Sequence, residues 1–406
     1  LLNYPPQAAS YDQQWHSLLS STFLRLGDLS AARRELMELD TADEELRELT
    51  WASLDLAADE PAKVLERLLP HAGSGDLQQA FRPWSPHSRV QAWSLMGEAA
   101  LALERPADAL RWLENAVHGA SEWDTVRAEQ GAGSVIGEWL GLHVVVLLAR
   151  AYIRLDRPLD AAVVIESFQS RKLRAASGGA VTEVDGNLLT AWASRFEGGL
   201  VTWVIGADHG VVAHVGPEGD AWAGALPHGR RAVQSGVRRL REAVVAQDEA
   251  QTERLASEVT AGLIPMQIET RLAHAREGAA TLFLLHGPLE PLPLSAVQLD
   301  GAPIDERLTP CVLPGLPVDS EGPPLDGPWT LLGNPTRSET PHSVRLPGAE
   351  RELAELRRLY PTASAFTGTR FTKAAAFDAL AGTGPLHIAT HLVHDARCEG
   401  TALASV

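Results

Sequence analysis

The chain has 406 residues and a formal net charge of −17 at pH 7, and 45% of its residues are hydrophobic and 21% charged. This composition is ordinary for a globular protein of two or three domains. The negative charge argues against a surface for nucleic acid or anionic membranes, which requires clustered lysine and arginine.

The sequence predicts no membrane-spanning segment, no signal peptide and no disulfide or zinc cross-links. The longest apolar run, 144–149, is too short to span a bilayer, and Leu1-Leu2 lacks the basic residues of a signal peptide. The two cysteines, Cys311 and Cys398, are far apart, which predicts neither a disulfide framework nor a structural zinc site. We therefore expect a cytoplasmic protein. The sequence does not begin with methionine, and residues 401–406 carry no helix-stop signal or polar tail. We therefore also expect the natural chain to be longer.

Residues 1–175 are rich in alanine and leucine and repeat a helical pattern, which predicts about four helical hairpins. Small residues where two helices approach alternate with large ones that fill the groove between hairpins, as in tetratricopeptide repeats. The repeated positions are Leu19, Ser20, Phe23, Ala32, Leu36 and Leu39; Trp51, Ala52, Val64 and Leu68; Trp93, Met96, Gly97, Ala100, Ala109, Leu113 and Ala116; and Leu148, Ala149, Tyr152, Ala161, Ile165 and Phe168. Such an α-solenoid commonly holds a peptide or a partner protein on its concave face.

Residues 176–328 change to an alternating pattern after Ser177-Gly178-Gly179, which predicts a new domain. The pattern predicts strands at 188–192, 200–205, 211–215 and 281–285 and helices at 229–246 and 251–275. The proline and glycine density of 303–328 predicts a long connector with few regular elements.

Residues 329–406 alternate between strands and helices. Strands are predicted at 329–332, 363–366 and 386–391, and helices at 349–360 and 372–380, with Thr372 as an N-cap. Two right-handed crossovers make the three strands parallel neighbours in one sheet. The third strand ends in His391, and ligands of such sheets bind beyond the carboxyl ends of the strands. His391 is therefore the leading catalytic candidate.

Several collinear motifs give the second half of the chain, from about residue 160, a specific resemblance. It resembles a CHAT domain, a caspase-like domain that occurs with tetratricopeptide repeats, in the clan of caspases, separases and gingipains. The motifs are Leu284-Leu285-His286-Gly287-Pro288-Leu289, Leu292-Pro293-Leu294, Glu306-Arg307-Leu308, Leu331-Leu332-Gly333-Asn334-Pro335, Leu346-Pro347-Gly348-Ala349-Glu350-Arg351-Glu352 and Leu386-His387-Ile388-Ala389-Thr390-His391.

The resemblance implies a cysteine endopeptidase without a cofactor, which cleaves a protein target in bacterial signalling or defence. It makes His391 the histidine of a Cys–His dyad, whose cysteine is expected to end the next parallel strand, beyond Val406. The family usually has glycine after this histidine, where the backbone N–H faces the oxyanion; here the residue is Leu392. Leu392 either narrows the substrate groove or marks an inactive relative that serves as a binding scaffold.

Other chemistry is disfavoured by the local sequence. Cys398 lies in a polar loop and Cys311 in an apolar strand, so neither is predicted to be the nucleophile. The spacing of His387, His391 and His394 is compatible with a zinc-peptidase helix, but Ile388 replaces the required glutamate and a strand is predicted here. The segment 333–335 lacks the lysine of a phosphate-binding loop, and no nucleotide site is predicted.

Overall fold

The computed structural model describes residues 16, 19–20, 22–24, 26–38, 44–72, 81, 83–129, 135–177, 184–313, 316, 330–335, 347–380 and 386–389. The chain divides into two compact units, Leu1–Val318 and Asp319–Val406. Both are mixed α/β, and the sheet pairings are mostly parallel, as the sequence predicts. No helix in the described ranges has the combined length and apolar character needed to cross a membrane.

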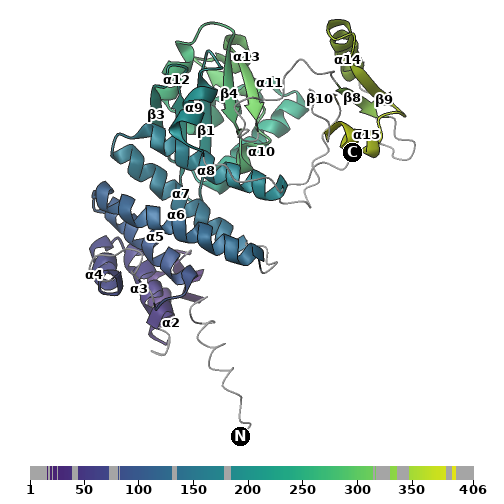
Figure 1. Ribbon diagram of the computed structural model, residues 1–406. Helices are drawn as coiled ribbons and strands as arrows, with labels where there is room; N and C mark the ends of the chain where they lie inside the picture. Colours follow the sequence, from purple (N-terminus) through teal and green to yellow (C-terminus); the bar gives the residue numbers. More distant parts are fainter. Residues whose placement is uncertain are drawn as a thin grey trace. The chain divides into compact units, whose positions relative to one another are not determined.

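Helices follow one another as antiparallel pairs in the first part of unit 1 (Figure 1). They are α2 (Leu29–Met37), α3 (Glu44–Ala57) with α4 (Pro61–Ala72), α5 (Pro86–Ala102) with α6 (Pro106–Glu129), and α7 (Val135–Arg154) with α8 (Pro158–Ser177). Most of the repeated positions predicted to pack are buried, including Ala32, Met96, Leu113 and Ile165. The predicted positions Leu19, Phe23, Trp51, Tyr152 and Phe168 are only partly buried, and Leu39 lies outside the described residues. Gly97 lies where a Cβ would come within 2.5 Å of the Leu113 side chain, so the close approach of α5 and α6 requires a glycine.

The same turn joins the two helices of each of these three pairs and also precedes α2. In all four cases one residue of the turn has a left-handed backbone. The N–H of the residue that follows it donates to the carbonyl oxygen five residues earlier, at 2.8–2.9 Å. The left-handed residues are Gly27, Asp59, Glu104 and Asp156. Three of the four are therefore not glycine, although glycine is the residue best suited to this conformation.

Replacing Glu104 with glycine is expected to stabilise the protein. Glu104 is exposed at φ +56°, and no contact of its side chain would be lost. Relief of the left-handed strain should raise the free energy of unfolding by about 0.5–1 kcal/mol, and Glu104→Val should lower it because a β-branched residue fits this region worst. Urea denaturation of both variants checks this; equal stability would contradict the strain.

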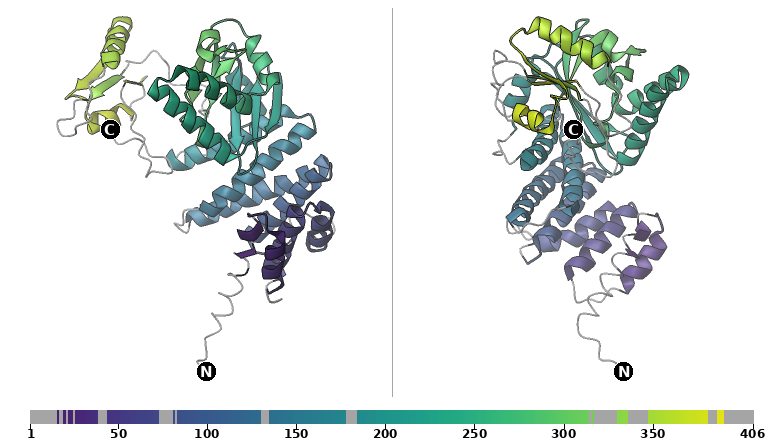
Figure 2. Two further views of the ribbon diagram at one scale, coloured as in Figure 1. Left: turned by 180° about the vertical axis from the view of Figure 1, so that it is seen from behind. Right: turned by 90° about the vertical axis from the view of Figure 1, so that its right-hand side faces the viewer.

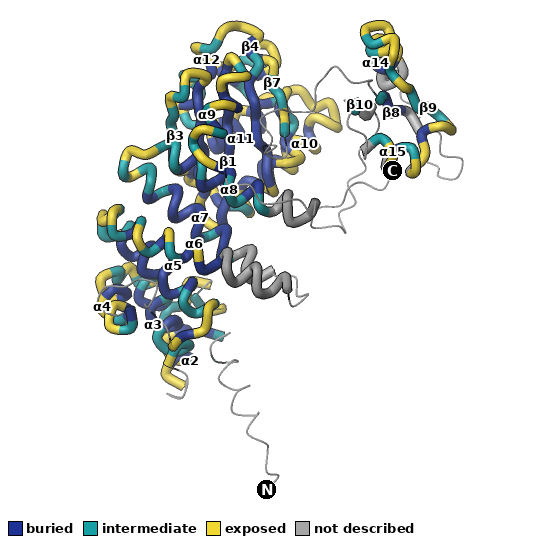
Figure 3. The backbone as a smooth tube through the Cα atoms, in the orientation of Figure 1, coloured by how far each residue is buried: buried dark blue, intermediate teal, exposed yellow. Residues whose placement is uncertain are grey.

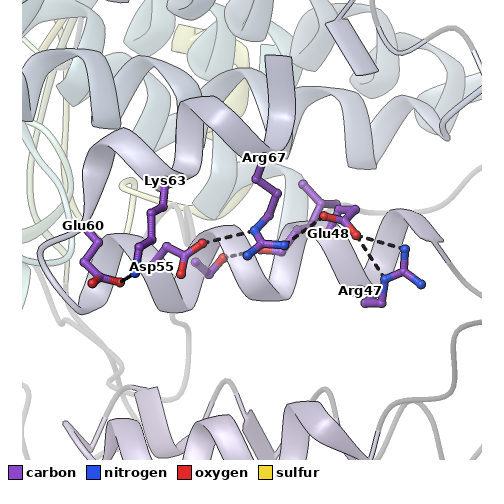
Figure 4. A network of polar contacts seen from close by, with 8 residues as sticks. Arg47, Glu48, Asp55, Glu60, Lys63 and Arg67 are labelled. Atoms are coloured by element: carbon purple, nitrogen blue, oxygen red, sulfur yellow. Dashed lines mark hydrogen bonds and ion pairs between the residues drawn. The ribbon is translucent and has the colours of Figure 1, made fainter. Parts of the chain in front are cut away.

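A polar network on the outer side of α3 and α4 fixes these two helices together (Figure 4). The Arg67 guanidinium donates to Asp55 at 3.1 Å and to Glu48 at 3.2 Å and lies 5.5 Å from the centre of the Trp51 ring. Arg47 also contacts Glu48. One arginine thus satisfies the nearly buried Asp55 carboxylate, which would otherwise be costly to keep in the core.

A five-stranded sheet follows the helices in unit 1. Its strands are β1 (Leu200–Ile205), β2 (Gly210–Val215), β3 (Ala221–Leu226), β4 (Ala279–Leu284) and β7 (Leu308–Leu313), in the order β3-β2-β1-β4-β7. The first two pairings are antiparallel and the last two parallel. A separate two-stranded ribbon pairs β5 (Gln298–Leu299) with β6 (Ala302–Pro303).

Helices cover both faces of this sheet (Figure 2). Leu200 and Val204 share a core with α7 and α8, whereas Val201, Trp203 and Ile205 share one with α10 (Arg230–Ala246), α11 (Glu249–Leu263) and α12 (Met266–Ala273). The alternation follows from the two-residue period of a strand. The core of the helical pairs therefore continues directly into one face of the sheet, because α7 and α8 belong to both.

Residues 188–192 form a helix, so the predicted strand there is wrong. Helix α9 (Gly186–Ala193) begins at Asp185, whose carboxylate accepts from the Leu188 N–H at 2.8 Å. Its buried residues Leu189, Trp192 and Ala193 have helical spacing. The pattern of this short apolar run did not distinguish a helix from a strand, and the Asp185 N-cap favours the helix.

Three further elements differ from the sequence prediction. The helix expected over 251–275 is two helices, α11 and α12, because Pro265 separates them. Strand β3 was not predicted, since its alanines and glycine are poor strand formers; Gly224 leaves room for the Trp222 ring, which a Cβ would approach to 2.2 Å. The expected connector contains α13 (Ile304–Arg307) and β7, which pairs along its full length with β4. Short 3₁₀ turns occupy Gly287–Leu289 and Leu294–Ala296.

The free energy of unfolding is expected to decrease as the pH is lowered, because His214 is buried in the folded protein. Burial lowers the pKa of this imidazole below its ordinary 6.5, and its Nε2 lies 3.1 Å from the Gly198 carbonyl oxygen. The unfolded chain then takes up a proton that the folded protein does not, so stability is full above pH 6.5 and declines as the pH falls below it, by at most about 1.4 kcal/mol per pH unit.

Urea denaturation between pH 8 and pH 5 tests this expectation. His214→Gln should flatten the decline, whereas the same substitution at the exposed His209 should not. An equally steep decline in His214→Gln would assign it to other groups.

Unit 2 has the strand and helix alternation predicted for it. It contains β8 (Thr330–Pro335), α14 (Pro347–Leu359), β9 (Ser364–Gly368), α15 (Lys373–Leu380) and β10 (Leu386–Ala389), and the strands are parallel in the order β10-β8-β9. Leu331 packs with Leu353 of α14, and Leu332 packs with Ala376 of α15, so one helix covers each face. The Thr372 hydroxyl accepts from the Ala375 N–H at 3.1 Å, which confirms the predicted N-cap.

Candidate functional site

The predicted catalytic histidine follows strand β10. This strand pairs with β8 from Leu386 opposite Thr330 to Ala389 opposite Gly333, which confirms a parallel strand at the predicted place. His391 and Leu392 are two and three residues past the last strand residue and lie outside the described residues, as do His394 and Cys398.

The carboxyl ends of β10, β8 and β9 lie at one edge of the three-stranded sheet, because all three are parallel. There β8 and β9 shift in register between Gly333 and Pro335, and Gly368 ends β9 at φ +58°. Glycine is the residue best suited to this left-handed conformation. This edge is where ligands bind in open parallel sheets.

A hollow of about 510 Å³ in unit 2 lies between β9 and α15. Its lining includes Thr330 and Ser364, the first residues of β8 and β9, so it reaches the edge opposite to the one that β10 points toward. Arg370 lines it, donates to the Ala365 carbonyl at 2.6 Å and lies 5.8 Å from the Phe366 ring centre. The Arg370 guanidinium is therefore held against strand β9, and the hollow lies toward the edge of the sheet where the strands begin, not the edge where they end.

A buried polar cluster in unit 1 links the last repeat helix to the sheet. The Glu166 carboxylate of α8 accepts a short hydrogen bond from the Thr202 hydroxyl of β1, and its same oxygen lies 3.3 Å from Nε2 of His286, just past β4. Glu166 and Thr202 are fully buried and His286 is 8% exposed. The second carboxylate oxygen of Glu166 has no hydrogen-bond partner. Glu166, Thr202 and His286 are called the α8–sheet cluster below.

The α8–sheet cluster is a packing link in a closed core. Apolar residues of the same core surround it, including Ile165, Leu200 and Leu284. His286 stands in one of the collinear motifs in the second half of the chain, whereas Glu166 and Thr202 were not predicted from the sequence as site residues. Glu166 directly follows the repeat position Ile165 but is not itself a repeat position, so the pattern gave no signal for it.

Among the described residues, Cys311 is the one cysteine, and it is not set up as a nucleophile. It lies on β7, and burial raises the pKa of its thiol, which keeps the sulfur protonated near neutral pH. Its packing against the core of unit 1 agrees with the predicted core role.

The described part of the chain contains no group of three or more His, Cys, Asp or Glu side chains that could hold a metal ion. His387 lies in strand β10, not in a helix, which removes the spacing that a zinc-peptidase motif requires at this residue. A scan against protein-family models gives no match for this chain, and a search of curated proteins finds no relative.

Proposed function

We propose that the protein is a caspase-like cysteine endopeptidase of the CHAT type, in which the helical pairs of residues 1–175 recognise a protein or peptide and the C-terminal part cleaves a protein target in the cytoplasm. The carrying observation is the collinear set of motifs that ends in Leu386–His391. It is supported by the place of β10 as the third strand of a parallel sheet with a helix on each face. The proposed setting is bacterial signalling or defence.

The proposed chemistry uses His391 as the group that moves a proton to the leaving amine. An imidazole is suited to this because its ordinary pKa lies near neutrality. The backbone N–H of Leu392 would face the oxyanion, and a thiolate on the next parallel strand, in sequence beyond Val406, would attack the peptide carbonyl. No metal or cofactor takes part in this scheme.

A second candidate function is a binding scaffold without peptidase activity. The observation that favours it is Leu392 in the position where the resembling family has glycine. The helical pairs would then be the functional part, as a surface for partner proteins.

Thiol-dependent cleavage by the full-length gene product distinguishes the two candidates. A proteome-derived peptide library is incubated with the protein, alone and with extract of the source cells to supply a trigger. The peptidase proposal expects new termini that disappear after alkylation by iodoacetamide. Absence of thiol-dependent cleavage under both conditions would support the scaffold.

A further inference from the structure

Helix α10 differs in charge from the rest of the chain. Its 17 residues contain five arginines and a single glutamate, whereas the whole chain has a net charge of −17. One side of α10 is buried in the core shared with α11 and the sheet; its residues are Val233, Gly236, Val237, Leu240 and Ala243. The arginines therefore lie on the remaining, solvent-facing circumference of the helix.

Helix α10 carries both buried and exposed residues (Figure 3). Some of the exposed residues form a line along the helix on the side away from its buried residues. These residues are spaced alternately by three and four, so they lie above one another on a helix and cover about 21 Å. We call them the α10 stripe: Arg231, Gln234, Arg238, Arg241 and Val245. The stripe combines positive charge with an apolar end, because Val245 is 75% exposed.

The arginines of the α10 stripe have unused hydrogen-bond donors. Within the described ranges Arg231, Arg238 and Arg241 form no ion pair or side-chain hydrogen bond, although Glu242 lies beside them on the helix. Arg239, which lies off the stripe, is 3.7 Å from Glu258 of α11, and Glu258 is also paired with Arg254. The guanidinium groups on the stripe are thus free to bind carboxylates in a bidentate manner.

We propose that the α10 stripe binds an acidic amphipathic helix of a partner protein. Carboxylates spaced by seven and three residues would face Arg231, Arg238 and Arg241, and an apolar side chain would cover Val245. A protein partner fits better than nucleic acid, because three arginines on a strongly negative protein offer little to a continuous phosphate backbone. The α10 stripe belongs to unit 1, whereas the histidine of the proposed peptidase follows β10 of unit 2, and this proposal does not rest on peptidase activity.

Fluorescence anisotropy with the full-length protein tests the proposal. The probe is a labelled, alanine-based helical peptide with glutamates at positions i, i+7 and i+10 and leucine at i+14. The triple variant R231E/R238E/R241E should bind it at least about tenfold more weakly, because attraction is replaced by repulsion. The matched control R276E/R351E/R357E changes the charge equally at exposed sites outside both the stripe and the helical pairs, and it should bind as the unchanged protein does. Val245→Asp should weaken binding without altering the arginines.

Four outcomes would overturn the proposal. Equal binding of a scrambled peptide would show that the helical spacing is irrelevant, and equal weakening in the control variant would show a non-specific charge effect. Tighter, stripe-dependent binding of a single-stranded oligonucleotide or of phosphatidylserine vesicles would assign the stripe to another class of ligand. A homodimer that the triple variant dissociates would make the occupant a second copy of this chain. Circular dichroism verifies that each variant is folded.

Discussion

Replacing His391 with alanine is expected to lower kcat/KM for peptide cleavage by about 10²–10⁴-fold, because the attacking thiol would lose its general base and the leaving amine its proton donor. The loss should fall mainly on kcat, since the imidazole acts in the transition state and contributes little to substrate binding. The measurement is steady-state cleavage of a peptide taken from the sites found with the library. Stability should be unchanged within experimental error.

Matched variants make this expectation sharp. His209→Ala removes an exposed histidine of unit 1 and should leave cleavage unaffected. Cys311→Ser should also be neutral, because partial burial raises the pKa of this thiol and so keeps it in the protonated, weakly nucleophilic form. Unchanged kcat/KM in His391→Ala would exclude this histidine from catalysis. If Leu392 obstructs the groove, Leu392→Gly should raise kcat/KM of the same peptide.

Replacing His286 with leucine is expected to destabilise the protein by about 1–3 kcal/mol, which is the typical cost of leaving a buried polar group without its hydrogen-bond partner. In the variant the Glu166 carboxylate would stay in an apolar core with the Thr202 hydroxyl as its remaining partner. Equilibrium unfolding in urea, followed by tryptophan fluorescence, measures the change.

A double variant separates the loss of the Glu166–His286 contact from the loss of side-chain packing. Glu166→Leu combined with His286→Leu removes both polar groups and should be more stable than His286→Leu alone, with a coupling of about 0.5–3 kcal/mol between the two sites. A double variant whose destabilisation equals the sum of the single changes would contradict a direct interaction between Glu166 and His286.

The helical part of the fold could be predicted well because its signal is repeated. Each pair reuses the same small and large positions, so Ala52, Ala100 and Ala149 support one another as evidence for one packing rule. Unit 2 was predictable for a different reason: glycine and proline separate its elements, and Thr372 marks a helix start. Local patterns and the tertiary structure agree in both regions.

The prediction failed where tertiary pairing or a cap overrides a weak local pattern. Residues 188–192 alternate as a strand would, but the Asp185 cap and a helical burial pattern fix a helix. Strand β3 has little intrinsic preference and forms through its pairing with β2. The α8–sheet cluster joins residues 36 and 120 positions apart, which no local window contains.

The double membership of α7 and α8 limits how the protein can be divided. A fragment that begins after Ser177 would expose the sheet face bearing Leu200, Val204 and Ala213 to water and would leave His286 without Glu166. Such an uncovered apolar sheet favours aggregation. The shortest piece of unit 1 with a covered sheet therefore starts near Val135, and truncation at the apparent end of the repeats would be a poor way to isolate the second half.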